Sequence, residues 1–329
     1  MTDAATTDEE MAAPPSGGRR RGQGHRQRPV RWGPVRWAKV GFGVAVVAFG
    51  ALFVARHAAE VGRALGEMGW LPVLGSIPLG AAGMLAAMMA WRAILADLGS
   101  PLRVGQASRV FFISQLGKYL PGSVWPMLAQ VELGRALRVP RRSSFAVGLL
   151  AIVLSLAVGL SVAFTLLPVG ATGALRRYWW TAFAVPVLLA ALHPRVVTSG
   201  LNLLLRTVRQ QPLEAAPTVR GMVRAAGWQV LNWLLLGLHC YLLVLGYHVD
   251  AARTLPLAVG GFAFAYCLGV LFIPAPAGAG VRDTVLVLAL AAALARPQAL
   301  AVALVSRVVM AGVDFAFGAF WASRRTRTE

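Results

Sequence analysis

The sequence predicts an all-α protein: a polytopic integral membrane helical bundle of about eight transmembrane spans, interrupted by proline- and glycine-broken segments. Hydrophobic residues make up 57% of the chain and charged residues only 14%, whereas a soluble domain carries about 25% charge. Several apolar stretches approach or exceed the roughly 20 residues needed to cross a bilayer. Basic and near-neutral loops also alternate along the chain, as in multi-pass membrane proteins.

The apolar stretches define the expected spans in order. They cover residues 38–55, 71–91, 145–167, 178–193, 228–247, 256–273, 282–296 and 299–321. Two of them, 178–193 and 282–296, are short for a full crossing. Eight spans are therefore expected, and six spans with two half-spans also fit the pattern.

Three regions follow from this division. Residues 1–36 form a basic tail that cannot bury enough apolar surface to fold alone and is expected to be disordered. Residues 37–322 form the transmembrane domain, and residues 323–329 form a short basic tail. A cleavable signal peptide is not expected, because the first apolar stretch starts far from Met1 and lacks a small-residue cleavage site.

The formal net charge of +19 arises mainly from the termini and a few loops. In a soluble protein this charge would suggest nucleic acid, but here membrane orientation explains it and no nucleic-acid partner is expected. The N-terminus, the 92–143 segment, the loop after residue 193 and the C-terminus are basic, whereas 56–70 and 248–255 are nearly neutral. The pattern predicts a plasma (inner) membrane protein with both termini in the cytoplasm. Arg176 and Arg177 are the exception, because they fall on the predicted outer side.

The first candidate site segment is an apolar stretch, 111–126, interrupted by proline and glycine. It contains Lys118, Tyr119, Pro121 and Gly122. One interpretation is a re-entrant element made of two half-helices that meet at Pro121-Gly122, with its backbone buried in protein or beside a wet cavity. The other is an amphipathic helix on the inner leaflet followed by a turn.

The second candidate site segment, 272–283, holds two prolines and two glycines between apolar stretches. Its candidate site residues are Pro274, Pro276, Gly278, Gly280, Arg282 and Asp283. The free N–H groups of the helix expected to follow favour an anion, and the neighbouring arginine offers a fork-shaped donor to phosphate. The alternative is a tight turn whose arginine extends into the inner interface.

The last span carries Arg307 and Asp314 in an otherwise apolar stretch. Seven residues place them on one helix face about 10 Å apart, which is too far for a direct ion pair. Charges at this depth usually face a bundle interior or a wet cavity. We expect Arg282 to partner Asp314 and Asp283 to partner Arg307, as part of a binding site or as structural ion pairs between helices.

The remaining titratable residues predict no catalytic or metal chemistry. The five histidines show no ligand spacing, and His239 is expected to be a buried, hydrogen-bonded residue in its span. Cys240 and Cys267 fall in apolar stretches and cannot define a disulfide framework. No Ser/His/Asp grouping, phosphate loop or zinc motif is found, so neither an enzyme nor a cofactor is expected.

Three motifs together resemble the lysylphosphatidylglycerol synthase transmembrane family, a flippase-like membrane region. They are SQLGKYLPGSVWPMLAQVELGRALRVPRRSSFAVGLL, LFIPAPAGAGVRDTVLVLAL and SRVVMAGVDFAFG, and the resemblance covers about residues 35–322. The typical second motif reads Pro-x-Pro-Gly-Gly-x-Gly followed by a basic or small residue and Glu. Here Ala277 replaces one glycine and Asp283 replaces the glutamate. The chain ends after the last span, so the aminoacyltransferase domain of fused members is not expected.

The resemblance implies lipid handling. We expect a lipid flippase or transporter that moves a polar or phosphate-bearing lipid across the plasma membrane, such as a phospholipid, an aminoacyl-phospholipid or a prenyl-phosphate-linked lipid. The alternative is a non-transporting accessory subunit of a glycolipid or lipid-modifying pathway. Membrane lipids, anionic ones above all, are the expected partners, together with a lipid-modifying enzyme or glycosyltransferase.

Overall fold

A computed structural model describes residues 65–120, 125–170, 179–207, 216–272 and 276–324, with Ala59, Gly62 and Arg63. Within these residues every regular element is a helix. The expected span at 38–55 and the whole expected N-terminal tail, 1–36, lie outside them. The all-α class is confirmed.

Five helices are long and apolar enough to cross a membrane. They are α2 (Trp70–Asp97), α5 (Arg141–Gly170), α8 (Val219–Leu245), α9 (Ala251–Leu271) and α11 (Arg296–Ser323). Their 21 to 30 residues extend about 32 to 45 Å at 1.5 Å per residue, which exceeds the roughly 30 Å hydrocarbon core. The structure therefore confirms a multi-pass membrane protein.

The two short expected spans differ from full crossings. The segment 179–191 is followed by α7 (Pro194–Thr207) after a bend of 75°, so these two parts form at most one broken span; the α-helical part, α6, is Ala184–Ala191. In place of 282–296 the chain forms α10 (Val281–Leu290), whose ten residues extend only about 15 Å. This length favours the half-span that the sequence left open at 282–296, because a turn at 291–294 ends the helix before α11 begins. The described residues hold five spans, or six with the bent pair.

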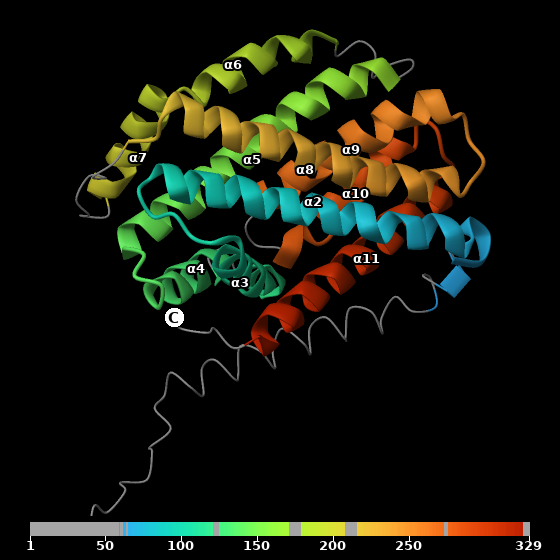
Figure 1. Cartoon of the computed structure of the whole chain (residues 1–329). Helices are drawn as coiled ribbons and strands as arrows, with labels where there is room; N and C mark the ends of the chain where they lie inside the picture. The colour runs from blue at the N-terminus through green and yellow to red at the C-terminus, as the bar shows by residue number, and fades with distance from the viewer. Residues whose placement is uncertain are drawn as a thin grey trace, which may run out of the picture. The chain divides into compact units, whose positions relative to one another are not determined.

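The long helices pack closely in pairs. Figure 1 shows α2 beside α8, and α5 packs on α9. Helix α8 also packs on α9, and a small residue permits the close approach: a Cβ added at Gly237 on α8 would lie 2.7 Å from the Cα of Val259 on α9. Close approach at small residues is a common way for membrane helices to associate.

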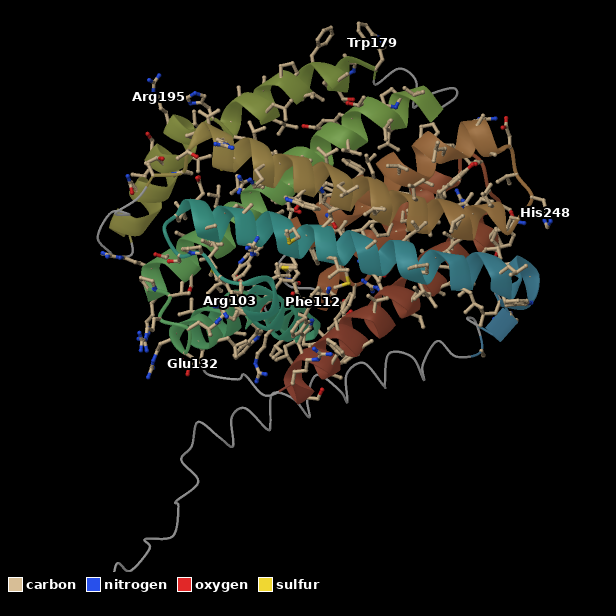
Figure 2. The ribbon with its side chains drawn as sticks, viewed as in Figure 1. Arg103, Phe112, Glu132, Trp179, Arg195 and His248 are labelled. Carbon is tan, nitrogen blue, oxygen red and sulfur yellow. The ribbon has the colours of Figure 1, made fainter. Side chains whose placement is uncertain are left out.

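Hydrogen bonds join the helix ends at one end of the bundle. Asp97, the last residue of α2, accepts bonds from the backbone N–H and the hydroxyl of Thr218 at 2.6 and 2.7 Å. Thr218 in turn caps α8, because its hydroxyl accepts from the N–H of Gly221. Arg109 donates to the carbonyl of Trp321 near the end of α11, at 3.1 Å. In Figure 2, Arg103 and Glu132 lie at the end of the bundle opposite His248.

The broken segment 111–126 is a helical hairpin. It consists of α3 (Val104–Gln115), the 3-10 helix η1 (Leu116–Tyr119) and, after residues 121–124, α4 (Trp125–Arg135). Phe112 on α3 is buried and stacks on Phe317 of α11 with ring centroids 4.4 Å apart (Figure 2). This burial supports the interpretation as two half-helices rather than a helix lying on the membrane surface. Pro121 and Gly122 lie outside the described residues.

Candidate functional site

The two proline- and glycine-broken segments meet inside the bundle. The end of the first, η1, lies against the short 3-10 helix η3 (Pro276–Gly278) of the second. Helix α11 contacts both segments. Residues that are more than 150 positions apart in the sequence thus form a single site.

Asp314 joins α11 to the first broken segment. Its Oδ2 lies 2.6 Å from the Nζ of Lys118 and accepts a 2.5 Å hydrogen bond from the hydroxyl of Tyr119. The ring of Tyr119 stacks on Phe315 with centroids 5.3 Å apart, which fixes the hydroxyl beside the carboxylate. Asp314 is only 2% exposed, so these two donors replace the water that a buried carboxylate would lose.

Arg307 joins α11 to the second broken segment. Its Nη1 lies 2.8 Å from the Oδ2 of Asp283, and its Nη2 donates to the carbonyl of Ala277 at 3.0 Å. Asp283 also accepts from the N–H of Gly280 at 3.1 Å and so caps the start of α10. The predicted pairing of Asp283 with Arg307 is confirmed.

The predicted pairing of Arg282 with Asp314 is wrong. Asp314 is already held by Lys118 and Tyr119, whose approach depends on the fold of the first segment. The guanidinium carbon of Arg282 instead lies 4.8 Å from the ring centres of both Phe262 and Tyr266. No carboxylate among the described residues pairs with Arg282. Its charge is stabilised by the faces of two aromatic rings.

The turn of the second segment requires unusual backbone angles. Gly278 has a φ of +66°, and a Cβ there would lie 2.7 Å from the Cα of Gly269 on α9. Gly280 also has a positive φ, and Pro276 begins η3. Ala277 adopts φ 49° and ψ 28°, a left-handed conformation that favours glycine. The glycine-to-alanine departure noted in this motif therefore falls on a position where glycine would be less strained.

A cavity of about 270 Å³ lies where these segments meet. Six of the predicted site residues line it: Lys118, Tyr119, Gly278, Arg282, Arg307 and Asp314. Pro276, Gly280 and Asp283 do not line it but shape the turn and hold Arg307. Pro121, Gly122 and Pro274 lie outside the described residues.

Sequence reasoning missed part of the cavity wall, namely amide, hydroxyl and aromatic side chains on α2, α4, α5 and α8. The indole N–H of Trp91 donates to Gln130 at 3.1 Å, and Gln229 donates to the hydroxyl of Ser155 at 2.9 Å; all four residues line the cavity. Isolated amides within apolar stretches were the available signal, because a polar group in a span requires a partner.

Two buried acceptors in the wall lack a donor among the described residues. They are the Oδ1 atoms of Asn232 and Asp314, and both residues line the cavity. A buried acceptor without a donor costs about 1–3 kcal/mol. These oxygens therefore mark positions where a bound molecule can donate hydrogen bonds.

His239 lies outside the cavity wall and ties three helices together. Its Nδ1 is 2.9 Å from the carbonyl of Ser76 on α2, and its Nε2 is 3.0 Å from the hydroxyl of Ser306 on α11. The prediction of a buried, hydrogen-bonded histidine is confirmed. Ser306 directly precedes Arg307, so this contact joins α8 to α11 beside the Arg307–Asp283 ion pair.

Comparison with known proteins gives one family. No curated protein matches the chain. The family model described as the lysylphosphatidylglycerol synthase TM region matches residues 37–318, which include every described residue of the two broken segments and of the cavity wall. The chain therefore belongs to the lysylphosphatidylglycerol synthase TM region family.

Proposed function

We propose that the protein is a lipid transporter that carries a phosphate-bearing lipid across the plasma membrane through this cavity. The observation that supports this function best is Arg282, a cation without a carboxylate partner among the described residues, in the wall of a cavity between membrane helices. An isolated charge at membrane depth is costly and usually marks a substrate path. A lipid phosphate would offset that cost, and Lys118 and the N-terminus of α10 would assist it.

The size of the cavity suits a head group rather than a whole lipid. About 270 Å³ lies just below the usual range for small-ligand pockets of roughly 300–1,000 Å³. Ile152 on α5 lines the cavity and is also 39% exposed on a spanning helix. Acyl chains would remain in the bilayer beside this opening while the phosphate enters the bundle.

The charges at the helix ends favour access from the cytoplasm. The cavity is lined by the C-terminal part of α2 and the N-terminal part of α5, including Trp91, Ile94 and Gly148. This end of the bundle carries a cluster of arginines on the adjoining loops and helix ends: Arg92, Arg103, Arg109, Arg135, Arg138, Arg141, Arg142, Arg220 and Arg224. Basic loops remain cytoplasmic, so both termini would lie inside the cell.

Transport would require the broken segments to move. The tips η1 and η3 are short. The ion pair Lys118–Asp314 ties η1 to α11, whereas Arg307 of α11 bonds the Ala277 carbonyl of η3 and pairs with Asp283 at the start of α10. Breaking and re-forming these pairs would let a head group pass between the tips, as broken helices do in transporters. The mechanism involves no covalent step and no cofactor, and a lipid-modifying enzyme would supply or consume the lipid.

Reconstitution tests this proposal. Purified protein in liposomes should expose a fluorescently tagged anionic phospholipid to a membrane-impermeant reductant faster than empty liposomes do. Arg282→Gln should reduce that rate at least tenfold, since a charge-assisted contact to phosphate contributes about 1.5–3 kcal/mol. Arg296→Gln, which removes an exposed arginine at the far end of α11 outside the cavity wall, is the matched control and should keep the rate.

The outcome that contradicts transport is equally specific. If the protein speeds the movement of no anionic lipid across the liposome membrane while a positive control is active, the transport proposal is wrong. If Arg282→Gln then still complemented a gene deletion, a non-transporting accessory role would be favoured.

A further inference from the structure

We infer, resting on the proposed function, that the cavity selects a lipid with one net negative charge and a hydroxylated head group. The chemical class is a phosphodiester of a polyol or sugar. Such a head group carries one phosphate charge and several O–H donors, and neither an amine nor a second phosphate charge is present. The inference follows from the charge balance of the cavity and from its unpaired acceptors.

The charge balance comes from the ion pairs. Lys118 neutralises Asp314, and Asp283 neutralises Arg307. Among the charged residues that the structure describes in the wall, Arg282 alone remains without an opposite charge, so the cavity has one net positive charge. A phosphodiester monoanion restores neutrality. A dianionic phosphate would leave one negative charge in the low-dielectric interior, where an uncompensated charge is strongly unfavourable.

The unpaired acceptors define the rest of the head group. Asn232 is 3% exposed and Asp314 is 2% exposed, and the Oδ1 of each lacks a donor among the described residues. An amide oxygen and an ionised carboxylate can only accept, so the ligand must donate. Hydroxyl groups do so without adding charge.

An amine would also donate but fits the charges less well. The only carboxylate that the structure describes in the wall is Asp314, and Lys118 already lies 2.6 Å from it. A head-group ammonium would place a further positive charge among Lys118, Arg282 and Arg307. The cavity thus disfavours zwitterionic and cationic head groups.

Liposome transport with matched lipids tests this inference. Phosphatidylglycerol and phosphatidylmethanol, tagged on the acyl chain, have the same charge but only the first has hydroxyls. Phosphatidylglycerol should move about tenfold faster, because a hydrogen bond to a charged acceptor contributes roughly that factor. Phosphatidylethanolamine and phosphatidic acid, which supply the amine and the phosphomonoester, should both move more slowly than phosphatidylglycerol.

A variant assigns the selectivity to the cavity. Asn232→Leu should slow phosphatidylglycerol and leave phosphatidylmethanol unchanged, which brings the two rates together. Asn202→Leu makes the same change on α7, outside the cavity wall, and should keep the difference. The lipid comparison in the unchanged protein tests the inference even if Asn232→Leu does not fold.

The outcomes separate the two proposals. Equal rates for phosphatidylglycerol and phosphatidylmethanol would mean that water satisfies the acceptors, and faster movement of phosphatidylethanolamine would mean that the charge argument is wrong. Either result overturns this inference and leaves transport standing. No movement of any lipid overturns the proposed function, and this inference with it.

Discussion

Arg307 and Asp314 lie on one helix, and each contacts a different one of the two broken segments. The site therefore forms where α11 meets both segments. Each of these two residues is at most 9% exposed, and each forms its ion pair with one of the two broken segments. Removing one partner of a buried ion pair typically costs about 3–5 kcal/mol, because the remaining charge is left uncompensated. The two ion pairs thus tie α11 to η1 and to the start of α10.

A double-mutant cycle at Asp283 and Arg307 tests the second of these pairs. Asp283→Asn and Arg307→Gln should each lower the free energy of unfolding, and the double variant should lose less than the sum, with a coupling of about 0.5–3 kcal/mol. Thermal unfolding in detergent gives the values. Asp250→Asn is the control, because Asp250 caps α9 at the exposed surface in a similar way and should show no coupling with Arg307→Gln. If the losses in the free energy of unfolding at Asp283 and Arg307 are additive, the two side chains do not stabilise each other.

At the scale of elements, short helices end inside the bundle while long helices cross it. The hairpin of α3, η1 and α4 and the ten-residue α10 place helix ends where unpaired backbone groups can face a cavity. Such ends are tolerated at membrane depth only within protein or beside water. The long helices must therefore hold a rigid frame around them, and glycine contacts such as Gly237 against Val259 provide it.

Gly237→Leu should weaken this frame. A side chain there would overlap the backbone of Val259 and force α8 away from α9, which lowers the free energy of unfolding by about 1–3 kcal/mol. Gly227→Leu on the same helix is the matched control, since nothing lies within 4 Å of a Cβ at that position. Thermal unfolding in detergent compares the two variants, and equal loss in both would contradict the packing argument.

At the scale of the whole molecule, the helix ends divide between two sides of the membrane. Hydrogen bonds between Thr218 and Asp97 join the N-terminal end of α8 to the C-terminal end of α2, and Arg109 on α3 bonds the C-terminal end of α11. The start of α9, near Asp250, lies at the other end of the long helices. Positive charge at the first end predicts that it faces the cytoplasm.

Cysteine labelling in intact cells tests this orientation. A membrane-impermeant maleimide should label Ala252→Cys from outside, and should label Ser323→Cys only after permeabilisation. Both positions are exposed, whereas the native Cys240 and Cys267 are fully buried and provide an unreactive background. The reverse labelling pattern would place the basic end outside and would contradict cytoplasmic access to the cavity.

The membrane environment, the class of fold and most of the ionisable site residues could be predicted from the order of the amino acids alone. Low charge and long apolar stretches require a membrane, and isolated charges or proline–glycine breaks in such stretches require a protein interior. Lys118, Arg282, Arg307 and Asp314 could therefore be identified as cavity residues from their positions in apolar segments. The pairing of Asp283 with Arg307 could also be predicted, because the two residues lie on α10 and α11, which are consecutive in the chain.

The pairing of Asp314 with Lys118 and Tyr119, rather than with Arg282, became apparent from the folded structure. That choice depends on η1 reaching α11 across almost 200 residues of sequence, and no local pattern encodes the direction in which a half-helix enters the bundle. The length of α10 and the presence of amide side chains in the cavity wall likewise depend on how the helices pack. Pairing inside a bundle follows from how helices pack in three dimensions, whereas hydropathy reports only on each helix separately.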